Sequence, residues 1–274
     1  MKKRILQQKV TISGPDFFGR KSSITFLPAE NDGWYLETKY HGLVPIDHNI
    51  AYSKKGRLQL RSGGTVANVV EHILALRILI GLDRVILIVH CPWLPYLGGA
   101  GGYVQQLQEA SIQTDEDFKT IAPIRECSLS VHNTLGTRVS IRNHTGNLIV
   151  KLRSRWTPLP EYADTVSLED LAQEVFRQKI LTALPQGFPH YRKAVAKVCA
   201  FFGWPNMKYV AWQDDFKTPE EAAFGWWAHA LQDTCGCLVL CHHQYLPSLF
   251  YMRKFAGHRE DLLITKKAYS SITK

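Results

Sequence analysis

The sequence feature that most constrains the fold is a long apolar run, Val66–Ile80, followed by a strand-like run at Arg84–Val89. A helix through the first run carries apolar side chains on most of its sides, so we expect it to be buried on most sides. Glu71 and His72 fall on its one narrow polar stripe. Because an unpaired buried carboxylate is costly, this stripe must meet solvent, a partner or a cavity.

The Glu71–His72 pair has two interpretations. A carboxylate beside an imidazole is the combination that a general base and a metal ligand require. The pair could equally be a polar edge where the helix crosses the domain surface. The local pattern leaves both interpretations open.

The composition is that of a globular protein with one large domain or two of ordinary size, since 45% of the 274 residues are hydrophobic and 21% are charged. No run approaches the ~18–20 apolar residues of a membrane span. The basic start lacks the apolar stretch of a secretory signal. The six cysteines have no disulfide-framework spacing, which predicts a reducing, cytoplasmic setting.

The formal net charge of +9, from 33 Lys and Arg against 24 Asp and Glu, suits an anionic partner such as a nucleotide or phosphosugar. The basic residues are dispersed and not interleaved with aromatics, so nucleic-acid binding is not expected. The stretch Gly98–Gly102 lacks the Gly-Lys-Ser/Thr ending of a phosphate-binding loop. It favours a loop that tolerates close backbone approach.

The order of patterns along the chain predicts an α+β fold. Strand patterns lead into helical patterns twice, and the second half has expected helices at Ser167–Leu184 and His190–Phe202. The polar stretch Gln113–Asp117 between the halves is typical of a linker. We therefore expect two α+β modules, residues 1–118 and 119–274.

The tail Trp204–Lys274 has no clear assignment and contains a dense group of thiols and imidazoles, Cys235–His243. Cys235, Cys237 and Cys241 alternate with other residues, which predicts one face of a buried strand. A metal site is the alternative that remains open.

Three segments of residues 7–110 resemble the UDP-3-O-acyl-N-acetylglucosamine deacetylase family, the zinc enzymes of lipid A synthesis. They are the helix and strand around Val70–Ile73 and Ile80–Asp83, the turn Gly14–Gly19 and the loop Pro92–Gly102. The resemblance implies two modules packed as layered sandwiches with a cleft between them. It also implies Zn²⁺ as cofactor, a cytoplasmic location, and an acylated UDP-sugar or a related anionic small molecule as partner.

The resemblance also implies roles for individual residues. His72 matches a zinc ligand, and Glu71 matches the base that takes a proton from the attacking water. The closest match to the family's Ser-Gly-His general acid is His258, which follows Ala256 and Gly257.

The remaining ligands in the family are a His and an Asp four residues apart on one helix. We place that helix at Glu174–Thr182, where Gln178 and Thr182 occupy the two ligand positions. Lys179 then matches a family lysine that offers charge to a diphosphate or an oxyanion. An amide oxygen and a hydroxyl are poor Zn²⁺ donors, so this alignment predicts an incomplete metal site.

Two functional hypotheses follow. The first is zinc-dependent amide hydrolysis on an acylated UDP-sugar, weak or lost in this chain. The second is a non-catalytic homologue that binds a sugar nucleotide, an acyl chain or a protein partner.

Overall fold

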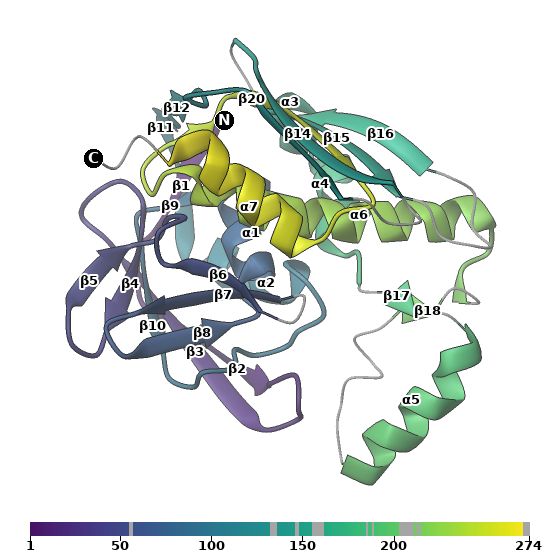
Figure 1. The fold of residues 1–274 in the computed structure, drawn as a ribbon. Coiled ribbons are helices and arrows are strands. Elements are labelled where there is room, and N and C mark those ends of the chain that lie inside the picture. The colour runs from purple at the N-terminus through teal and green to yellow at the C-terminus, as the bar shows by residue number, and fades with distance from the viewer. Residues whose placement is uncertain are drawn as a thin grey trace.

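Two five-stranded mixed sheets form the frame of the molecule (Figure 1). The computed structural model describes residues 1–54, 57–131, 136–145, 148–154, 162–184, 186–187, 189–202, 211–212 and 215–270. Helices and smaller strand groups connect and cover the two sheets, which confirms the predicted α+β class.

The first module is built around the sheet of order β2-β3-β10-β4-β5. Its strands are β2 (Val10–Pro15), β3 (Lys21–Pro28), β4 (Trp34–Thr38), β5 (Gly42–Pro45) and β10 (Val85–Val89). Two three-stranded sheets accompany it: β6 (Ala51–Lys54), β7 (Arg57–Ser62) and β8 (Thr65–Asn68), and then β1 (Lys2–Leu6), β9 (Leu82–Asp83) and β11 (Ser111–Asp117). The helices are α1 (Glu71–Leu79) and α2 (Gly101–Glu109).

The second module is built around the sheet of order β13-β14-β20-β15-β16. Its strands are β13 (Cys127–Val131), β14 (Thr137–Asn143), β15 (Ile149–Ser154), β16 (Tyr162–Ser167) and β20 (Leu249–Lys254). The short pairs are β12 (Thr120–Ile121) with β19 (Leu246–Pro247), and β17 (Gln186–Gly187) with β18 (Ala211–Trp212). The helices are α3 (Leu168–Ala172), α4 (Glu174–Leu181), α5 (Pro189–Phe202), α6 (Pro219–Leu238), the 3-10 turn η3 (Val239–Cys241) and α7 (His258–Tyr269).

The two main sheets repeat one topology. In each, the last strand along the chain, β10 or β20, enters the centre of the sheet. This strand is antiparallel to one neighbour and parallel to the other. The boundary at residues 118 and 119 stays a prediction.

Several predicted elements differ from the observed ones. The expected helix from Val66 starts only at Glu71, because Thr65–Asn68 pairs with β7 and Val69 turns the chain with a positive φ of 65°. The expected linker Gln113–Asp117 lies in β11 because the strand pairs with β1. The expected single helix from Ser167 to Leu184 is two, because Gln173 takes an extended conformation between them.

The prediction of a strand at the cysteine-rich segment is also wrong. Cys235 and Cys237 lie in α6, and Cys241 lies in η3. Helix α6 has strong start signals: the Thr218 side chain accepts a hydrogen bond from the backbone N–H of Glu221, and Pro219 occupies the first turn. Helix α6 is buried along most of its length, so small cysteine side chains can pack on several of its faces. Their spacing in the sequence then resembles the alternation that is typical of a strand.

Helices α1 and α6 pack against each other closely enough to exclude a side chain at Gly236. A Cβ there would lie 2.1 Å from the Glu71 carbonyl oxygen. Every residue of α1 is buried, as the apolar pattern predicts. The two helices share one continuous hydrophobic core with both sheets, so residues of the two halves meet at this contact.

None of the helices in the described part of the chain has both the length and the apolar character needed to cross a bilayer.

Candidate metal centre and active site

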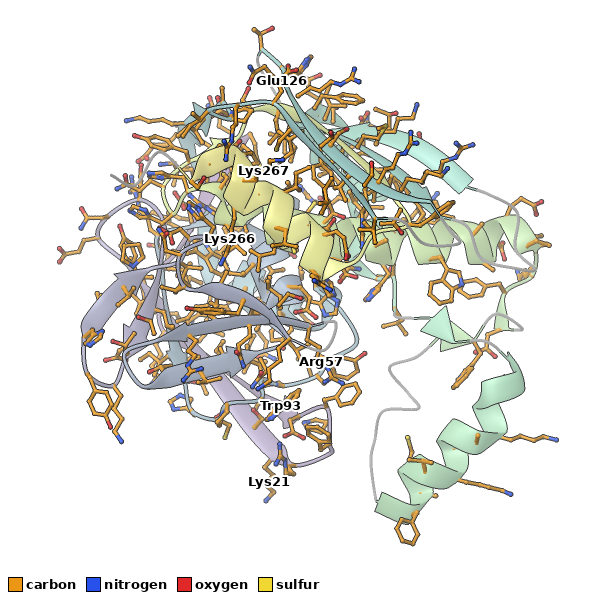
Figure 2. All side chains as sticks on the ribbon, in the orientation of Figure 1. Lys21, Arg57, Trp93, Glu126, Lys266 and Lys267 are labelled. Carbon is orange, nitrogen blue, oxygen red and sulfur yellow. The ribbon has the colours of Figure 1, made fainter. Side chains whose placement is uncertain are left out.

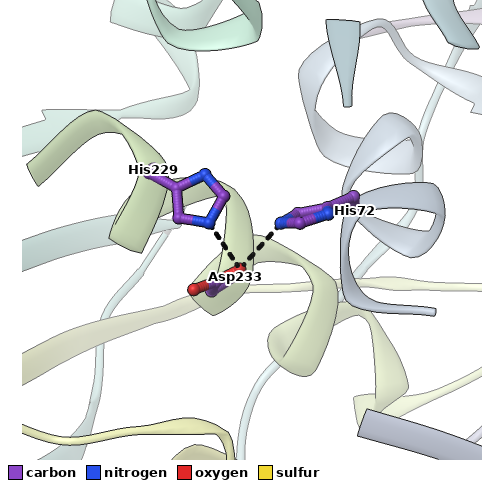
Figure 3. Close-up of side chains that lie close together, drawn as sticks. All are labelled: His72, His229 and Asp233. Carbon is purple, nitrogen blue, oxygen red and sulfur yellow. Dashed lines mark ion pairs between the residues drawn. The ribbon is translucent and has the colours of Figure 1, made fainter. Parts of the chain in front are cut away.

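Helix α6 places His229 and Asp233 beside His72 of α1 (Figure 3). The spacing of four residues puts both α6 side chains on one helical face. His72 Nε2 lies 3.1 Å from Asp233 Oδ1, and His229 Nε2 lies 3.9 Å from the same oxygen. The two imidazole ring centres are 4.9 Å apart.

The donor atoms of these three residues fit a metal ion. One potential ligand atom from each residue lies within 4.8 Å of the other two. His72 Nε2 and Asp233 Oδ1 are buried and face each other, and neither meets hydrogen-bond criteria with any group of the described structure. Buried polar atoms are normally satisfied, so a cation shared by these two atoms and His229 Nε2 would fit the site. Two imidazoles and a carboxylate suit a catalytic Zn²⁺, which keeps a further position open.

The imidazole of His229 is held in place from behind. Its Nδ1 lies 3.4 Å from the carbonyl oxygen of Ala183. A proton on Nδ1 that donates to this carbonyl leaves the Nε2 lone pair free to face Asp233. Metal-binding histidines are commonly oriented by a second contact of this kind.

Burial and neighbouring charge set the protonation of the three side chains. Burial lowers the pKa of His229 to about 4, against the opposing charge of Asp233. Burial works to raise the pKa of Asp233, but the surrounding histidines outweigh it and hold the pKa well below the usual range. Burial works to lower the pKa of His72, but Asp233 and Glu71 outweigh it and raise the pKa. An anionic Asp233 and a neutral His229 can both donate lone pairs at neutral pH, whereas the raised pKa of His72 means that protons compete with a metal for its nitrogen.

Glu71 and His258 complete the group, which we call the His72 cluster: Glu71, His72, His229, Asp233 and His258. The Glu71 carboxylate accepts a hydrogen bond from the backbone N–H of Leu58 at 3.3 Å. His258 Nε2 lies 3.7 Å from the other Glu71 oxygen and 3.8 Å from Asp233 Oδ2. A carboxylate and an imidazole therefore lie next to the three donor atoms, where a base and an acid would be needed.

His258 is the first residue of α7, whose start is fixed by a hydrogen bond from the Gly257 N–H to the Glu260 carboxylate. It also belongs to a second group with metal-ligand spacing, with Cys237 and Asp261. Burial raises the pKa of the Cys237 thiol well above its usual range, which disfavours the thiolate that a metal needs. The second group therefore fits structural anchoring of His258 better than metal binding.

The sequence model of the UDP-3-O-acyl N-acetylglycosamine deacetylase family matches residues 3–265. The chain belongs to this family. No curated protein matches the chain at the similarity required. At family level the protein is thereby placed with the deacetylases of lipid A biosynthesis, as the resemblance in its first half indicates.

Of the two expected ligand positions in the second half, neither lies at this group of donor atoms. Gln178 and Thr182 lie on and just after α4, where both are exposed; the amide of Gln178 donates to Glu174, and the hydroxyl of Thr182 donates to the Gln178 carbonyl. Neither lies beside His72; the two residues four apart that do are His229 and Asp233 on α6.

Lys179 is the third site residue predicted on this helix. This lysine is exposed on α4 and forms no ion pair with the His72 cluster in the described structure. On α6 the position directly after His229 is Ala230.

A pocket of about 690 Å³ lies between α6 and the end of α4 with the residues that follow it. Its lining includes the apolar residues Ala183, Leu184 and Phe224. Ala183 also provides the carbonyl oxygen that contacts His229, so one residue links the pocket wall to the His72 cluster.

Proposed function

We propose that this protein is a zinc-dependent deacetylase that removes the N-acetyl group of an acylated UDP-amino sugar. The observation that carries the proposal is the His72–His229–Asp233 group, in which two buried imidazoles and a carboxylate converge with metal-ligand spacing. His72, His229 and Asp233 would hold the ion. When bound, Zn²⁺ supplies positive charge to polarise an amide carbonyl and to lower the pKa of water.

The chain's own residues would move the protons. Glu71 is oriented by the Leu58 N–H and would accept a proton from the attacking water. His258 would deliver a proton to the amine nitrogen that leaves, since its Nε2 lies across from the Glu71 carboxylate. The apolar pocket of α4 and α6 would receive the substrate's acyl chain.

The first experiment is metal analysis of the purified protein. We expect about one zinc per chain, lost in His229→Ala and Asp233→Ala, because catalytic zinc needs all three protein ligands. Gln178→Ala is the matched control and should keep its zinc. Retention of zinc by His229→Ala, or its loss in Gln178→Ala, would contradict the placement of the site on α6.

The second experiment separates the enzyme from a non-catalytic homologue. Acetate release from the acylated UDP-sugar should fall by about 10²–10⁴-fold in Glu71→Gln, because a general base contributes on that order. The same variant should keep its zinc, since Glu71 is not among the three donor residues. A zinc-loaded wild-type protein that releases no acetate would favour the binding homologue.

A further inference from the structure

We infer that Arg57 binds a phosphate group of the substrate beside the His72 cluster, with its guanidinium held by the rings of Phe17 and Trp93. The inference rests on the proposed function, because it assigns a role to Arg57 in recognising the diphosphate of the sugar nucleotide. Figure 2 labels Arg57 and Trp93, which lie together on the first module.

The guanidinium of Arg57 is in cation–π contact with two aromatic rings. Its Cζ lies 4.4 Å from the centre of the Phe17 ring and 5.2 Å from the centre of the Trp93 ring. Stacking uses the faces of the planar guanidinium and leaves the N–H donors at its edge free to point outward. The rings thus fix the plane of a cation without neutralising it.

Arg57 has no anionic partner within the part of the chain that the structure describes. No carboxylate pairs with it and no acceptor receives its N–H groups. Arg20 provides a contrast on the same aromatic surface: its guanidinium stacks on Phe18 at 5.0 Å, but it is paired with Asp16 at 2.7 Å. Of these two stacked arginines, only Arg57 is available to an external anion.

The backbone places Arg57 next to the His72 cluster. The following residue, Leu58, is fully buried and donates its N–H to Glu71. Side chains alternate along a strand, so Arg57 lies on the opposite face of β7 from Leu58, toward the surface. Trp93 is brought to this point by a bridge to Asn68, at the end of the neighbouring strand β8.

Tyr96 links the aromatic frame to the cluster. Its ring contacts Phe17 with centres 5.5 Å apart. Burial raises the pKa of Tyr96, the charges of Glu71 and Asp233 raise it further, and Arg57 opposes them. The charges of the cluster's carboxylates and of Arg57 therefore both act on the Tyr96 hydroxyl.

This arrangement fits a diphosphate better than a neutral ligand. The carboxylates of Glu71 and Asp233 would repel a phosphate group that approached the cluster unaided. A fixed guanidinium fork binds phosphate oxygens through two parallel charge-assisted hydrogen bonds. Arg57 can thus hold the anionic end of a sugar nucleotide while the sugar reaches the cluster.

The test measures binding of UDP to the zinc-loaded protein by calorimetry. We expect Arg57→Gln to weaken UDP binding by about tenfold or more, since hydrogen bonds to charged groups have that effect on affinity. Arg20→Gln is the matched control, because it removes a stacked arginine whose charge is already paired. The affinity of this variant for UDP should stay within about twofold of that of the wild type. Zinc content and thermal midpoint show that both variants fold.

Arg57→Lys provides a second variant, which keeps the charge but loses the planar fork. We expect an intermediate loss of UDP affinity. An unchanged affinity in Arg57→Gln, equal losses in Arg57→Gln and Arg20→Gln, or no UDP binding by wild type would overturn the inference. UDP binding needs no acetate release, so an inactive protein with Arg57-dependent binding would contradict only the proposed function.

Discussion

Gln232 shows how one buried side chain can position a whole site. It is fully buried on α6 between His229 and Asp233. Its amide donates to the carbonyl oxygens of Ile180 and Ala183 and accepts from the N–H of Ala100. It thereby ties α6 to the end of α4 and to the start of α2.

Replacing Gln232 with leucine should lower the free energy of unfolding by about 3 kcal/mol or more. The change leaves buried backbone groups at Ala100, Ile180 and Ala183 unpaired, and each unpaired group costs about 1–3 kcal/mol. Urea denaturation measures the loss. Gln105→Leu, on the exposed face of α2, should change stability by no more than about 0.5 kcal/mol. Similar values for the two variants would show that the Gln232 network adds little.

The cysteines provide a second residue-scale prediction. Burial raises the pKa of Cys235 and of Cys241 to about 12, whereas Cys91 is partly exposed. At pH 8 a thiol with that pKa is ionised in only about one molecule in ten thousand, and the thiolate is the reactive form. An aromatic disulfide reagent should therefore modify Cys91 rapidly in the native protein, and Cys91→Ser should lose this phase. Peptide mass analysis that finds Cys235 or Cys241 labelled before unfolding would contradict the packing of α6.

At the scale of elements, the contact of α1 with α6 decides the geometry of the His72 cluster. Gly236→Ala should destabilise the protein by about 1–3 kcal/mol, because the added Cβ would meet the Glu71 backbone, which cannot move as a flexible side chain can. The thermal midpoint should fall by about 2–4 °C for each kcal/mol lost. At Gly257 the nearest atom to an added Cβ is 3.6 Å away, so the thermal midpoint of Gly257→Ala should fall less than that of Gly236→Ala. Equal midpoints for the two variants would argue against a tight helix contact.

The sequence pattern predicted one side of this contact and missed the other. The apolar periodicity around Glu71 and His72 identified a buried helix because apolar residues recur on every turn of it. Helix α6 was missed because its small, evenly buried residues carry little periodicity. A signal was present: Pro219 after Thr218 marks a helix start, and His229 with Asp233 has the spacing of two ligands on one face.

The glycine stretch of residues 98–102 also shows that a local sequence pattern can predict a close contact without identifying the partner in that contact. Its composition predicted close backbone approach, and a Cβ at Gly101 would indeed lie 2.4 Å from the Leu181 carbonyl oxygen. The partner in that approach comes from the second half of the chain, about 80 residues away in sequence. No local pattern contains that information, because the contact exists only once the two halves have packed.

For the whole molecule, the repeated sheet topology gives the His72 cluster its composite character. One module contributes Glu71 and His72 on α1, and the other contributes His229, Asp233 and His258 on α6 and α7. A ligand that engages both sets binds only the folded protein, in which the two halves are packed together. Ion binding and the stability of the whole chain should therefore be linked.

Zinc should accordingly raise the thermal midpoint of the chelator-treated protein. When free Zn²⁺ is 100 times its Kd, the stabilisation is about 2.7 kcal/mol, which corresponds to a rise of about 5–10 °C in a chain of this size. If the ion joins the two modules, His72→Ala and Asp233→Ala should each abolish the rise, while Lys179→Ala keeps it. If α6 held the ion alone, His72→Ala would keep most of the rise and Asp233→Ala would lose it, and the composite site would be refuted.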